Sequence, residues 1–409
     1  MHLSRVISVL VFSLLAICVA GAQTDTLHLT YTVRGTVSDA RSGKAIPSVN
    51  ITVPDRHYAT VSNADGAFVI KSDSPISELV FSCVGYKTLR ARVTDGMLAV
   101  RMTPDKYLLD PSSIISGEPS EIVRSAIRMI PENYSTRPEL LRCFYREALL
   151  KRNRYIAVSE AVSRIYKSSY LQIGRDDRAA LDKSRIIVSQ RRRDTISVKM
   201  MGGPTLAATF DVVKNPVILF EDFETDLYGF EMGAPEYIDD RLQFVIRFKP
   251  VREAPYALYN GTLYIDRDRL SFTRVEMSMD MSDPAKVTRQ LLVKKPAGLR
   301  FTPKEMTFVV TYRQNKGTLR LAYTSATMRF NCDWKKRMVA TNYTVINENV
   351  VTDVLEPAVQ IPRSQQFRAT DYMTDRAGEF LDPDFWEDYN IIEPSESLEH
   401  AVGRLHKTY

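Results

Sequence analysis

Two glutamates, Glu147 and Glu160, have a spacing that could place paired carboxylates side by side. They flank a basic turn at 151–154, and if the flanking segments form a hairpin, the two side chains could face each other. Such a pair can serve as general acid and general base. Basic residues also lie close by, at Arg146, Lys151 and Arg152. They favour a salt-bridged surface as the alternative interpretation.

The other groups that could do chemistry form no complete site. The acidic run from Glu221 to Asp226 could contain a glycosidase-type pair, although such a run more often means a solvated loop. Asp266 and Asp268 could touch a calcium ion, but calcium needs more than two oxygen ligands. The histidines beyond residue 22 form no zinc-peptidase motif and no nucleophilic triad: His28, His57, His400 and His406. We therefore predict no catalytic residue, no metal and no cofactor.

The stretch 259–279 shows the kind of element that must position these groups. Apolar and polar residues alternate up to Asp266, and Asp266–Arg269 supplies turn residues, so the sequence predicts a hairpin. The apolar parity changes between Phe272 and Val275, which predicts one extra residue, a β-bulge, in the second strand. Similar alternation on both sides predicts a curved antiparallel sheet for the larger part of the chain.

Helices are predicted to be few. Residues 120–130 carry an apolar stripe at helical spacing, with Ser120 as the N-cap, and 204–213 carries a shorter stripe. The segment 140–168 alternates and is rich in aromatic residues, which favours a hairpin. A helix remains the alternative there, because residues 147–149 have high helix propensity.

Residues 30–103 form the most regular module of the sequence. Short strand-like runs follow one another closely, and the connectors are rich in Gly, Asp, Ser and Pro, which predicts a small β-sandwich. Asp65-Gly66 supplies turn residues for a hairpin between Val61 and Phe68.

Four motifs occur in order in this module: Gly35–Asp39, Gly43–Val53, Asn63–Phe68 and Cys83–Tyr86. Together they resemble the carboxypeptidase-regulatory-like domain, a transthyretin-like seven-stranded β-sandwich of exported Gram-negative proteins. The same module precedes many outer-membrane nutrient transporters, whose copies usually carry Gly and Thr where this chain has Arg56-His57. The resemblance implies the sandwich fold, whereas the absent zinc ligands argue against carboxypeptidase activity.

Residues 120–370 resemble, in architecture, the half-barrel of periplasmic lipoprotein carriers and their relatives. The likeness rests on one helix followed by bulged hairpins, and on the strand pair that starts at Gly261 and Phe272. The whole layout is similar to a group of exported Gram-negative envelope proteins that carry the regulatory-like domain at the front. That resemblance implies no activity.

The chain is expected to divide into five segments. They are a signal peptide at 1–22, a carboxypeptidase-regulatory-like β-sandwich at 29–104, a linker at 105–119, a curved-sheet domain at 120–375 and a C-terminal tail with a short helix at 376–409. The predicted fold class is mainly β, with a seven-stranded sandwich followed by a larger α+β domain that contains a half-barrel and a few covering helices. The composition, 44% hydrophobic and 10% aromatic, is that of a globular protein.

The first 22 residues have the pattern of a secretory signal, with a basic start, an apolar run and Ala20-Gly21-Ala22 as cleavage site. We therefore predict export to the periplasm or the outer membrane. Cys18 raises the alternative of a lipoprotein, but the residue before it, Ile17, is not small. No later stretch is apolar for long enough to span a membrane.

Three cysteines follow the predicted cleavage site: Cys83, Cys143 and Cys332. An odd count in an exported chain leaves at least one free thiol, so no disulfide framework is expected. A bridge between Cys143 and Cys332 is conceivable if their strands are neighbours.

Two classes of function remain open. The first is a non-catalytic envelope protein whose concave sheet binds an apolar ligand or an extended peptide, or which acts as an assembly module at the outer membrane. Its predicted binding residues are Phe244, Ile246, Leu263, Ile265 and Phe308. Its predicted partners are a lipid, an acyl chain or an envelope protein, and no nucleic acid. The second class is a carboxylate-dependent, glycosidase-like hydrolase.

Two further features bear on binding. The net charge is +6, and its densest basic cluster is Arg191–Arg193, which allows anionic partners such as lipid head groups or else marks a solvated loop. In the tail, Phe385, Trp386 and Tyr389 could form a sugar- or peptide-binding face, but aromatic residues in a terminus more often anchor it.

Overall fold

A computed structural model of the protein describes most of the chain between residues 29 and 406. The described residues are 29–94, 96–105, 117–172, 177–189, 191, 194, 201–216, 226–292, 297–334, 340–376, 378–379, 386 and 388–406. Several predictions lie outside these residues: the signal peptide with Cys18, most of the linker, Arg192 and Arg193, the acidic residues 221–224, and Phe385.

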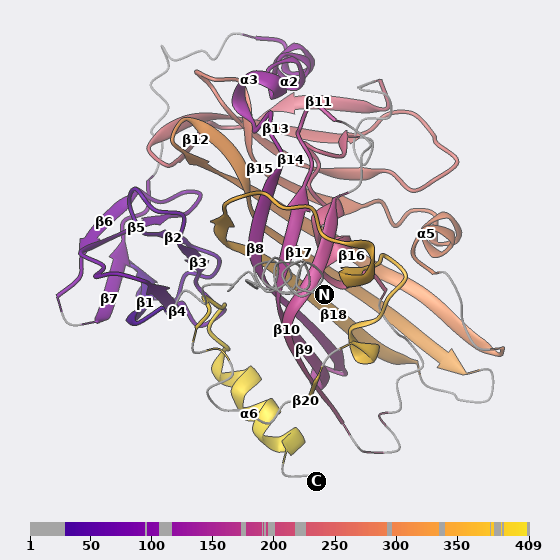
Figure 1. The fold of residues 1–409 in the computed structure, drawn as a ribbon. Coiled ribbons are helices and arrows are strands. Elements are labelled where there is room, and N and C mark those ends of the chain that lie inside the picture. Colours follow the sequence, from indigo (N-terminus) through magenta and orange to yellow (C-terminus); the bar gives the residue numbers. More distant parts are fainter. Residues whose placement is uncertain are drawn as a thin grey trace, which may run out of the picture.

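The N-terminal part is a sandwich of seven strands in two sheets, which confirms the predicted fold (Figure 1). One sheet has the order β4 (Ala67–Ser72), β1 (Tyr31–Asp39), β7 (Met97–Met102), and the other has the order β3 (Ala59–Val61), β2 (Asn50–Thr52), β5 (Glu78–Ser82), β6 (Leu89–Arg92). All neighbouring pairs are antiparallel except β1 and β7. Alternate residues of the strands fill a core between the sheets, including Val33, Val37, Ile51, Phe68 and Phe81.

The predicted hairpin between Val61 and Phe68 is wrong. The chain does turn at Asp65-Gly66, where Asn63 Oδ1 accepts hydrogen bonds from the backbone N–H groups of Asp65 and Ala67, each at 2.9 Å. However, β3 and β4 belong to different sheets. The turn therefore carries the chain from one layer of the sandwich to the other.

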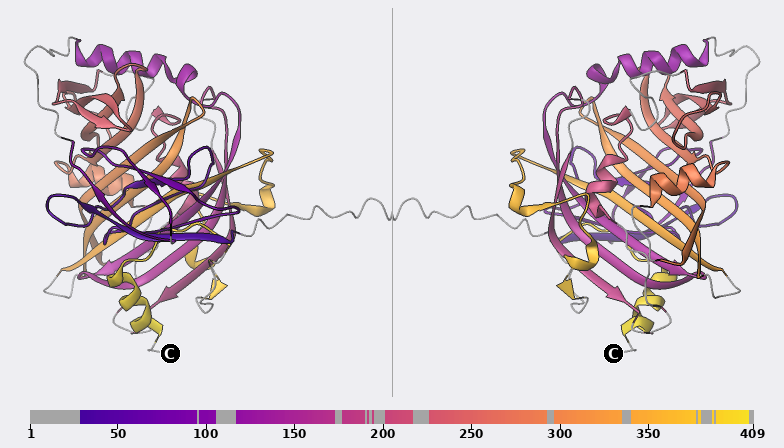
Figure 2. Two further views of the ribbon diagram at one scale, coloured as in Figure 1. Left: turned by 90° about the vertical axis from the view of Figure 1, so that its left-hand side faces the viewer. Right: turned by 90° about the vertical axis from the view of Figure 1, so that its right-hand side faces the viewer.

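The larger part is a thirteen-stranded, strongly curved sheet that does not close, because the end strands of its path do not pair. The path runs β11 (Tyr228–Met232), β13 (Arg241–Pro250), β14 (Tyr259–Asp266), β15 (Ser271–Met279), β16 (Leu299–Asn315), β17 (Thr318–Trp334), β18 (Thr341–Leu355), β8 (Glu139–Lys151), β9 (Arg154–Lys167), β10 (Arg178–Val188), β19 (Gln366–Phe367). Two short strands pair at its sides, β12 (Glu236–Ile238) with β13 and β20 (Gly378–Glu379) with β10. This confirms the predicted half-barrel (Figure 2).

The β14–β15 hairpin contains the predicted bulge. Tyr264 lies opposite Arg274 and Ile265 lies opposite Phe272, so Thr273 is the extra residue. In the turn, Asp266 Oδ1 accepts hydrogen bonds from the N–H groups of Asp268 and Arg269, each at 2.9 Å. The bulge increases the local twist and contributes to the curvature of the sheet.

The segment 140–168 forms the hairpin β8–β9, and the alternative of a helix is wrong. Its turn lies at Arg152 and Asn153, both of which have positive φ angles, of 50° and 60°. Both strands are long and are buried over most of their length. Pairing with β18 and β10 on the two outer sides overrides the helix propensity of residues 147–149.

Helices and loops cover the inner, concave face of the sheet. The helices here are α2 (Pro119–Arg128), α3 (Ile130–Asn133), α4 (Gly203–Thr209) and α5 (Pro284–Leu291). The apolar side of α2 packs into the same core as Val212, Val213 and the α5 residue Val287. Glu118 rather than the predicted Ser120 caps α2, since its carboxylate accepts a hydrogen bond from the backbone of Glu121 at 3.2 Å.

The C-terminal tail crosses the outer face of the sheet and not its concave side. After two 3₁₀ turns, η4 (Arg363–Gln365) and η5 (Met373–Asp375), the chain reaches Trp386, whose ring packs edge-on against Phe144 with a centroid distance of 5.5 Å. It ends in α6 (Glu396–His406), where Ser395 Oγ accepts from the N–H of Leu398 at 3.3 Å, as predicted for its cap. The aromatic tail thus docks onto the half-barrel, on the side where the sandwich also lies (Figure 1).

The three cysteines in the described residues are free thiols. Strand β18 lies between β8, which carries Cys143, and β17, which carries Cys332. The conceivable bridge between these two cysteines is therefore not formed.

Candidate functional site

The five residues predicted to bind an apolar ligand all lie in the core of the half-barrel. Their exposed fractions are small: Phe244 8%, Ile246 0%, Leu263 0%, Ile265 0% and Phe308 4%. Between α2, α3, residues 212–216 and the sheet, an apolar cavity of only about 10 Å³ remains. Ligand binding at these residues stays a prediction, and it would require the covering segments to move.

Glu147 and Glu160 do not form a carboxylate pair. The register of β8 and β9 places Glu147 opposite Ser159, and Glu160 opposite Arg146. Burial by itself would raise the pKa of Glu160, but the charges of Arg146 and Arg185, each 2.7 Å away, lower it. Glu160 is therefore part of a buried ion-pair network on the outer face, as the basic neighbours suggested.

Glu147 lies in a different environment. Its carboxylate accepts a hydrogen bond from the hydroxyl of Tyr145 at 2.9 Å. Burial raises the pKa of Glu147 to about 7. Within the described residues, no cation is paired with it.

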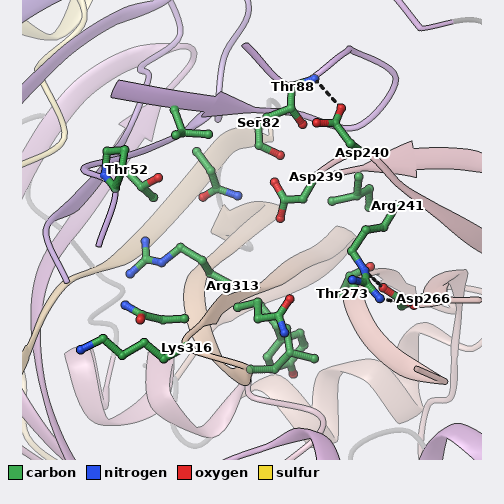
Figure 3. A pocket seen from close by; sticks show the side chains of 18 of the residues that line it. Thr52, Ser82, Thr88, Asp239, Asp240, Arg241, Asp266, Thr273, Arg313 and Lys316 are labelled. Carbon is green, nitrogen blue, oxygen red and sulfur yellow. Dashed lines mark hydrogen bonds and ion pairs between the residues drawn. The ribbon is translucent and has the colours of Figure 1, made fainter. Parts of the chain in front are cut away.

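A cleft of about 650 Å³ separates the sandwich from the half-barrel (Figure 3). One wall is the outward face of the four-stranded sheet of the sandwich, from which Asn50, Thr52 and Ser82 point into the cleft. The other wall consists of two turns of the half-barrel, at residues 239–240 and 266–269, and of the end of β16 with Lys316. These segments are far apart in the sequence and meet only because the sandwich docks on the outer face of the curved sheet.

Hydrophobic and polar contacts hold the two walls in place. On one side, Val84 of the sandwich packs against Ile238, Val245 and Tyr264 of the half-barrel. On another side, His57 Nδ1 accepts a hydrogen bond from Asn315 Nδ2 at 3.0 Å, which requires the neutral imidazole. Arg56-His57, where this chain differs from the transporter-associated copies, thus lies at the contact with the half-barrel.

Most charged groups that line the cleft are already bonded to other protein residues. Asp266 forms an ion pair with Arg241. Asp240 accepts a hydrogen bond from the backbone N–H of Thr88 at 3.3 Å, which links the half-barrel to the sandwich (Figure 3). Two arginines pair with acids outside the cleft, Arg56 with Asp73 and Arg90 with Glu78. The carboxylate of Asp266 also holds the β14–β15 turn, through the backbone N–H groups of Asp268 and Arg269.

Arg313 is the exception among the arginines that line the cleft. Its half-buried guanidinium has no hydrogen-bond or ion-pair partner among the described residues. Its neighbour across the β16–β17 ladder is another arginine, Arg320, which is itself paired with Glu139 at 2.5 Å. Burial lowers the pKa of Arg313 to about 10. The charges of Asp239 and Asp353 oppose this shift without contacting the guanidinium.

Asp239, an exposed residue, extends into the same cleft from another turn of the half-barrel wall (Figure 3). It occupies the tight β12–β13 turn, where both Asp239 and Asp240 have positive φ angles, of 53° and 58°. The surrounding walls desolvate the carboxylate and raise its pKa, although a hydrogen bond from the Ser82 hydroxyl opposes this. Asp239 has no ion-pair partner among the residues that the structure describes.

Two hydroxyl groups of the lining also lack partners. Ser271 Oγ and Thr88 Oγ1 are buried, and neither makes a hydrogen bond within the described residues. An unsatisfied buried hydroxyl is costly. Both oxygens are shielded from solvent, so they belong to the packing of the walls and are not offered to a ligand in the cleft. Sequence reasoning missed this site. The turn residues Asp239-Asp240 are recognisable, but no local pattern places them next to Ser82 and Arg313.

Residues 33–110 match the family model of the CarboxypepD_reg-like domain. Together with the fold of the larger part, this confirms the two-part architecture that the sequence motifs indicated. No curated protein matches the chain.

Three solved structures are similar to this chain at low identity. A DUF1329 family protein from Desulfovibrio piger is 9% identical, covers 61% of this chain and 100% of its own, and has a TM-score of 0.27. A LolA superfamily protein from Nitrosomonas europaea is 11% identical and covers 61% and 97%, with a TM-score of 0.19. A putative membrane-associated protein of unknown function from Bacteroides fragilis is 10% identical and covers 80% and 98%, with a TM-score of 0.15.

Two searches within the described residues gave negative results. No three or more His, Cys, Asp or Glu side chains gather there in a way that could hold a metal ion. None of the helices described has the length and apolar character needed to cross a membrane.

Proposed function

We propose that the protein is a non-catalytic, exported binding protein of the cell envelope, and that the cleft between sandwich and half-barrel binds an extended peptide. One observation carries the proposal. The cleft presents hydrogen-bonding side chains on both of its walls, Asn50 and Thr52 on the sandwich side and Gln314 on the half-barrel side.

The size and chemistry of the cleft suit a peptide better than an acyl chain. Its volume lies within the range of roughly 300–1,000 Å³ that is typical of ligand pockets. Its walls are rich in amides, hydroxyls and charges, including Asn50, Thr52, Gln314 and Asn315. A peptide backbone offers alternating N–H and C=O groups that such side chains can bind. The apolar cavity under α2, by contrast, is smaller than an acyl chain requires.

Export and envelope placement rest on the secretory pattern of residues 1–22. An assembly role at the outer membrane would use the same cleft, with an envelope protein supplying the peptide. The hydrolase alternative has weaker support, because two of the aspartates that line the cleft, Asp240 and Asp266, are engaged in holding the walls.

Site-specific photo-crosslinking tests the proposal. A benzophenone amino acid is placed at Gln314 in the cleft or, as the control, at Lys249, an exposed strand residue outside the lining. Each protein is irradiated with a mixed pool of synthetic decapeptides whose two termini are blocked. We expect adducts at Gln314 and few at Lys249.

A substitution that fills the cleft provides the second arm. Thr52→Trp would occupy the sandwich wall, whereas Thr32→Trp places the same side chain on an exposed strand position outside the cleft. We expect Thr52→Trp to lower the adduct yield at Gln314 at least tenfold and Thr32→Trp to leave it unchanged. Equal labelling at Gln314 and Lys249 would contradict the proposal.

A further inference from the structure

Six basic and four acidic residues line the cleft, so its formal charge is positive. Four of the six cations are already bound to other groups of the protein: Arg56 to Asp73, Arg90 to Glu78, Arg241 to Asp266, and Arg269 to the carbonyl oxygen of Gly317. The side chains of the other two, Arg313 and Lys316, make no hydrogen bond or ion pair with any residue that the structure describes. They are therefore the cations of the lining that a ligand could bind.

Positive charge is concentrated where β16 ends. Arg313 lies close to the end of this strand, and Lys316 follows in the turn. Figure 3 shows that the Arg313 side chain extends into the cleft, with Lys316 on the same side. The nitrogen atoms of this guanidinium are reached by solvent, unlike the two shielded hydroxyls of the lining. Across the β16–β17 ladder, Arg313 faces Arg320, which is itself paired with Glu139. An anion that enters this end of the cleft would therefore meet a free guanidinium and the charge of Lys316.

No acid among the described residues contacts the guanidinium of Arg313. Asp239 and Asp353 act on it only through space. Asp239 is exposed and accepts a hydrogen bond from the Ser82 hydroxyl, and Asp353 pairs with Arg142 at 3.6 Å. The facing strands of the sandwich, β2, β5 and β6, contribute no acidic residue to the lining. The guanidinium therefore stays available to an anionic ligand.

We propose that the cleft selects peptides that carry a carboxylate, which the free guanidinium of Arg313 binds while Lys316 adds its charge. A guanidinium offers two parallel N–H groups that match a carboxylate. The facing sheet supplies neutral hydrogen-bonding side chains, Asn50 and Thr52, for the peptide groups next to the anchored carboxylate. This inference rests on the proposed function, because it specifies which peptides the cleft binds.

Isothermal titration of the full-length protein with three pentapeptides tests the inference. The first, N-acetyl-Ala-Ala-Glu-Ala-Ala-amide, carries one side-chain carboxylate, and the second has Gln in place of Glu. The third, N-acetyl-pentaalanine, carries a carboxylate only at its C-terminus. We expect one or both of the carboxylate peptides to bind at least tenfold more tightly than the Gln peptide. Raising the NaCl concentration from about 50 mM to about 500 mM should weaken the preferred carboxylate peptide but not the Gln peptide.

Substitutions at the anchor link this preference to Arg313. Arg313→Gln should weaken the preferred carboxylate peptide at least tenfold and leave the Gln peptide unaffected, whereas Arg313→Lys keeps the charge and should retain part of the preference. Arg247→Gln is the matched control, since Arg247 is an exposed arginine of β13 outside the lining, and it should bind all three peptides like the wild type. Thermal unfolding checks that the variants fold, and Arg313→Gln should unfold near the wild-type temperature because it breaks no ion pair.

The possible outcomes separate the two proposals. Equal affinity for all three pentapeptides, or wild-type binding of the preferred carboxylate peptide by Arg313→Gln, overturns the carboxylate inference. If no pentapeptide binds while blocked decapeptides still label Gln314, the carboxylate inference fails and the peptide cleft stands. If neither kind of probe binds, both proposals fail.

Discussion

Asn390 of the tail and Lys71 of the sandwich exchange two hydrogen bonds. Asn390 Oδ1 accepts from the backbone N–H of Lys71 at 2.6 Å, and Asn390 Nδ2 donates to the Lys71 carbonyl at 3.0 Å. Since β4 is an edge strand of its sheet, the side-chain amide takes the place of a neighbouring strand. Further tail carbonyls accept hydrogen bonds from the sandwich or the half-barrel: Trp386 from Lys71 Nζ, Ile391 from Thr60, Ile392 from Arg146 and Pro394 from Asn63.

We expect Asn390→Ala to destabilise the protein by about 1–3 kcal/mol, because it leaves buried backbone groups of Lys71 without partners. Asn390 is 3% exposed, so water does not readily replace the lost amide. Urea unfolding measures the effect. Asn260→Ala, at an exposed position of β14, is the control and should change the stability little. Equal effects of the two substitutions would contradict the role of Asn390.

The sandwich is expected to fold without the half-barrel. Its core contains fifteen buried residues from strands and loops of the sandwich itself. Val61 of the sandwich lies outside this core. It packs with Trp386 and Phe144 in a cluster that spans sandwich, tail and half-barrel. A fragment of residues 30–102 should therefore melt cooperatively, but at a lower temperature than the whole protein. If the fragment is unfolded while the whole protein is folded, the proposed division of the chain is misplaced.

Local sequence patterns were sufficient to predict features that depend on a single pair of neighbouring strands. The parity change between Phe272 and Val275 predicted the bulge at Thr273, since the side-chain period of a strand leaves no other way to keep both halves on one face. Alternation likewise identified the β8–β9 hairpin.

Local sequence patterns did not predict features that depend on segments far apart in the sequence. A turn sequence such as Asp65-Gly66 predicts a change of direction but not the sheet that the chain joins afterwards. Register placed Glu147 opposite Ser159, which the sequence could not specify to one residue. The cleft was missed for the same reason, because Arg313 and Ser82 are brought together only when the sandwich docks.

His57 is expected to make the contact between sandwich and half-barrel sensitive to acid. Burial lowers the pKa of His57 from its usual 6.5, so the unfolded chain takes up a proton before the folded one. The stabilisation is therefore present above about pH 6.5 and is lost as the pH falls from there through the lower pKa of the folded state. We expect the wild type to lose more stability than His57→Gln between about pH 7.5 and about pH 5.5.

Urea unfolding at a series of pH values checks this expectation. His400→Gln is the control, because His400 is exposed on α6, and its pH profile should follow the wild type. Parallel profiles for wild type and His57→Gln would show that the imidazole does not titrate with folding.

Glu147 should have the opposite pH dependence. Burial raises its pKa to about 7, so the folded protein favours the protonated carboxyl. The favourable contribution is complete below about pH 4.5 and is lost as the pH rises through 7. Glu147→Gln should stabilise the protein by about 1–3 kcal/mol at about pH 8 and have little effect at about pH 4. Glu231→Gln, with a side chain 71% exposed, should be neutral at both values.

The predicted apolar site can be tested by loosening the packing of helix α2, which covers it. Val123 of α2 is fully buried against the inner face, and Val162 of β9 is 1% exposed in the cluster on the outer face. If an acyl chain binds after α2 moves, Val123→Ala should increase the uptake of an environment-sensitive fatty-acid probe. Val162→Ala removes the same two methyl groups elsewhere and should not.

Ile265→Asp should abolish that uptake, but it also places a carboxylate in the core, where an unpaired charge costs several kcal/mol or more. Its effect on binding is therefore informative only where circular dichroism shows that the variant is folded. The Val123→Ala and Val162→Ala pair avoids this difficulty, because both variants keep an apolar core. If neither differs from the wild type in probe fluorescence, the inner face is a filled core, and binding must be sought in the polar cleft beside Arg313.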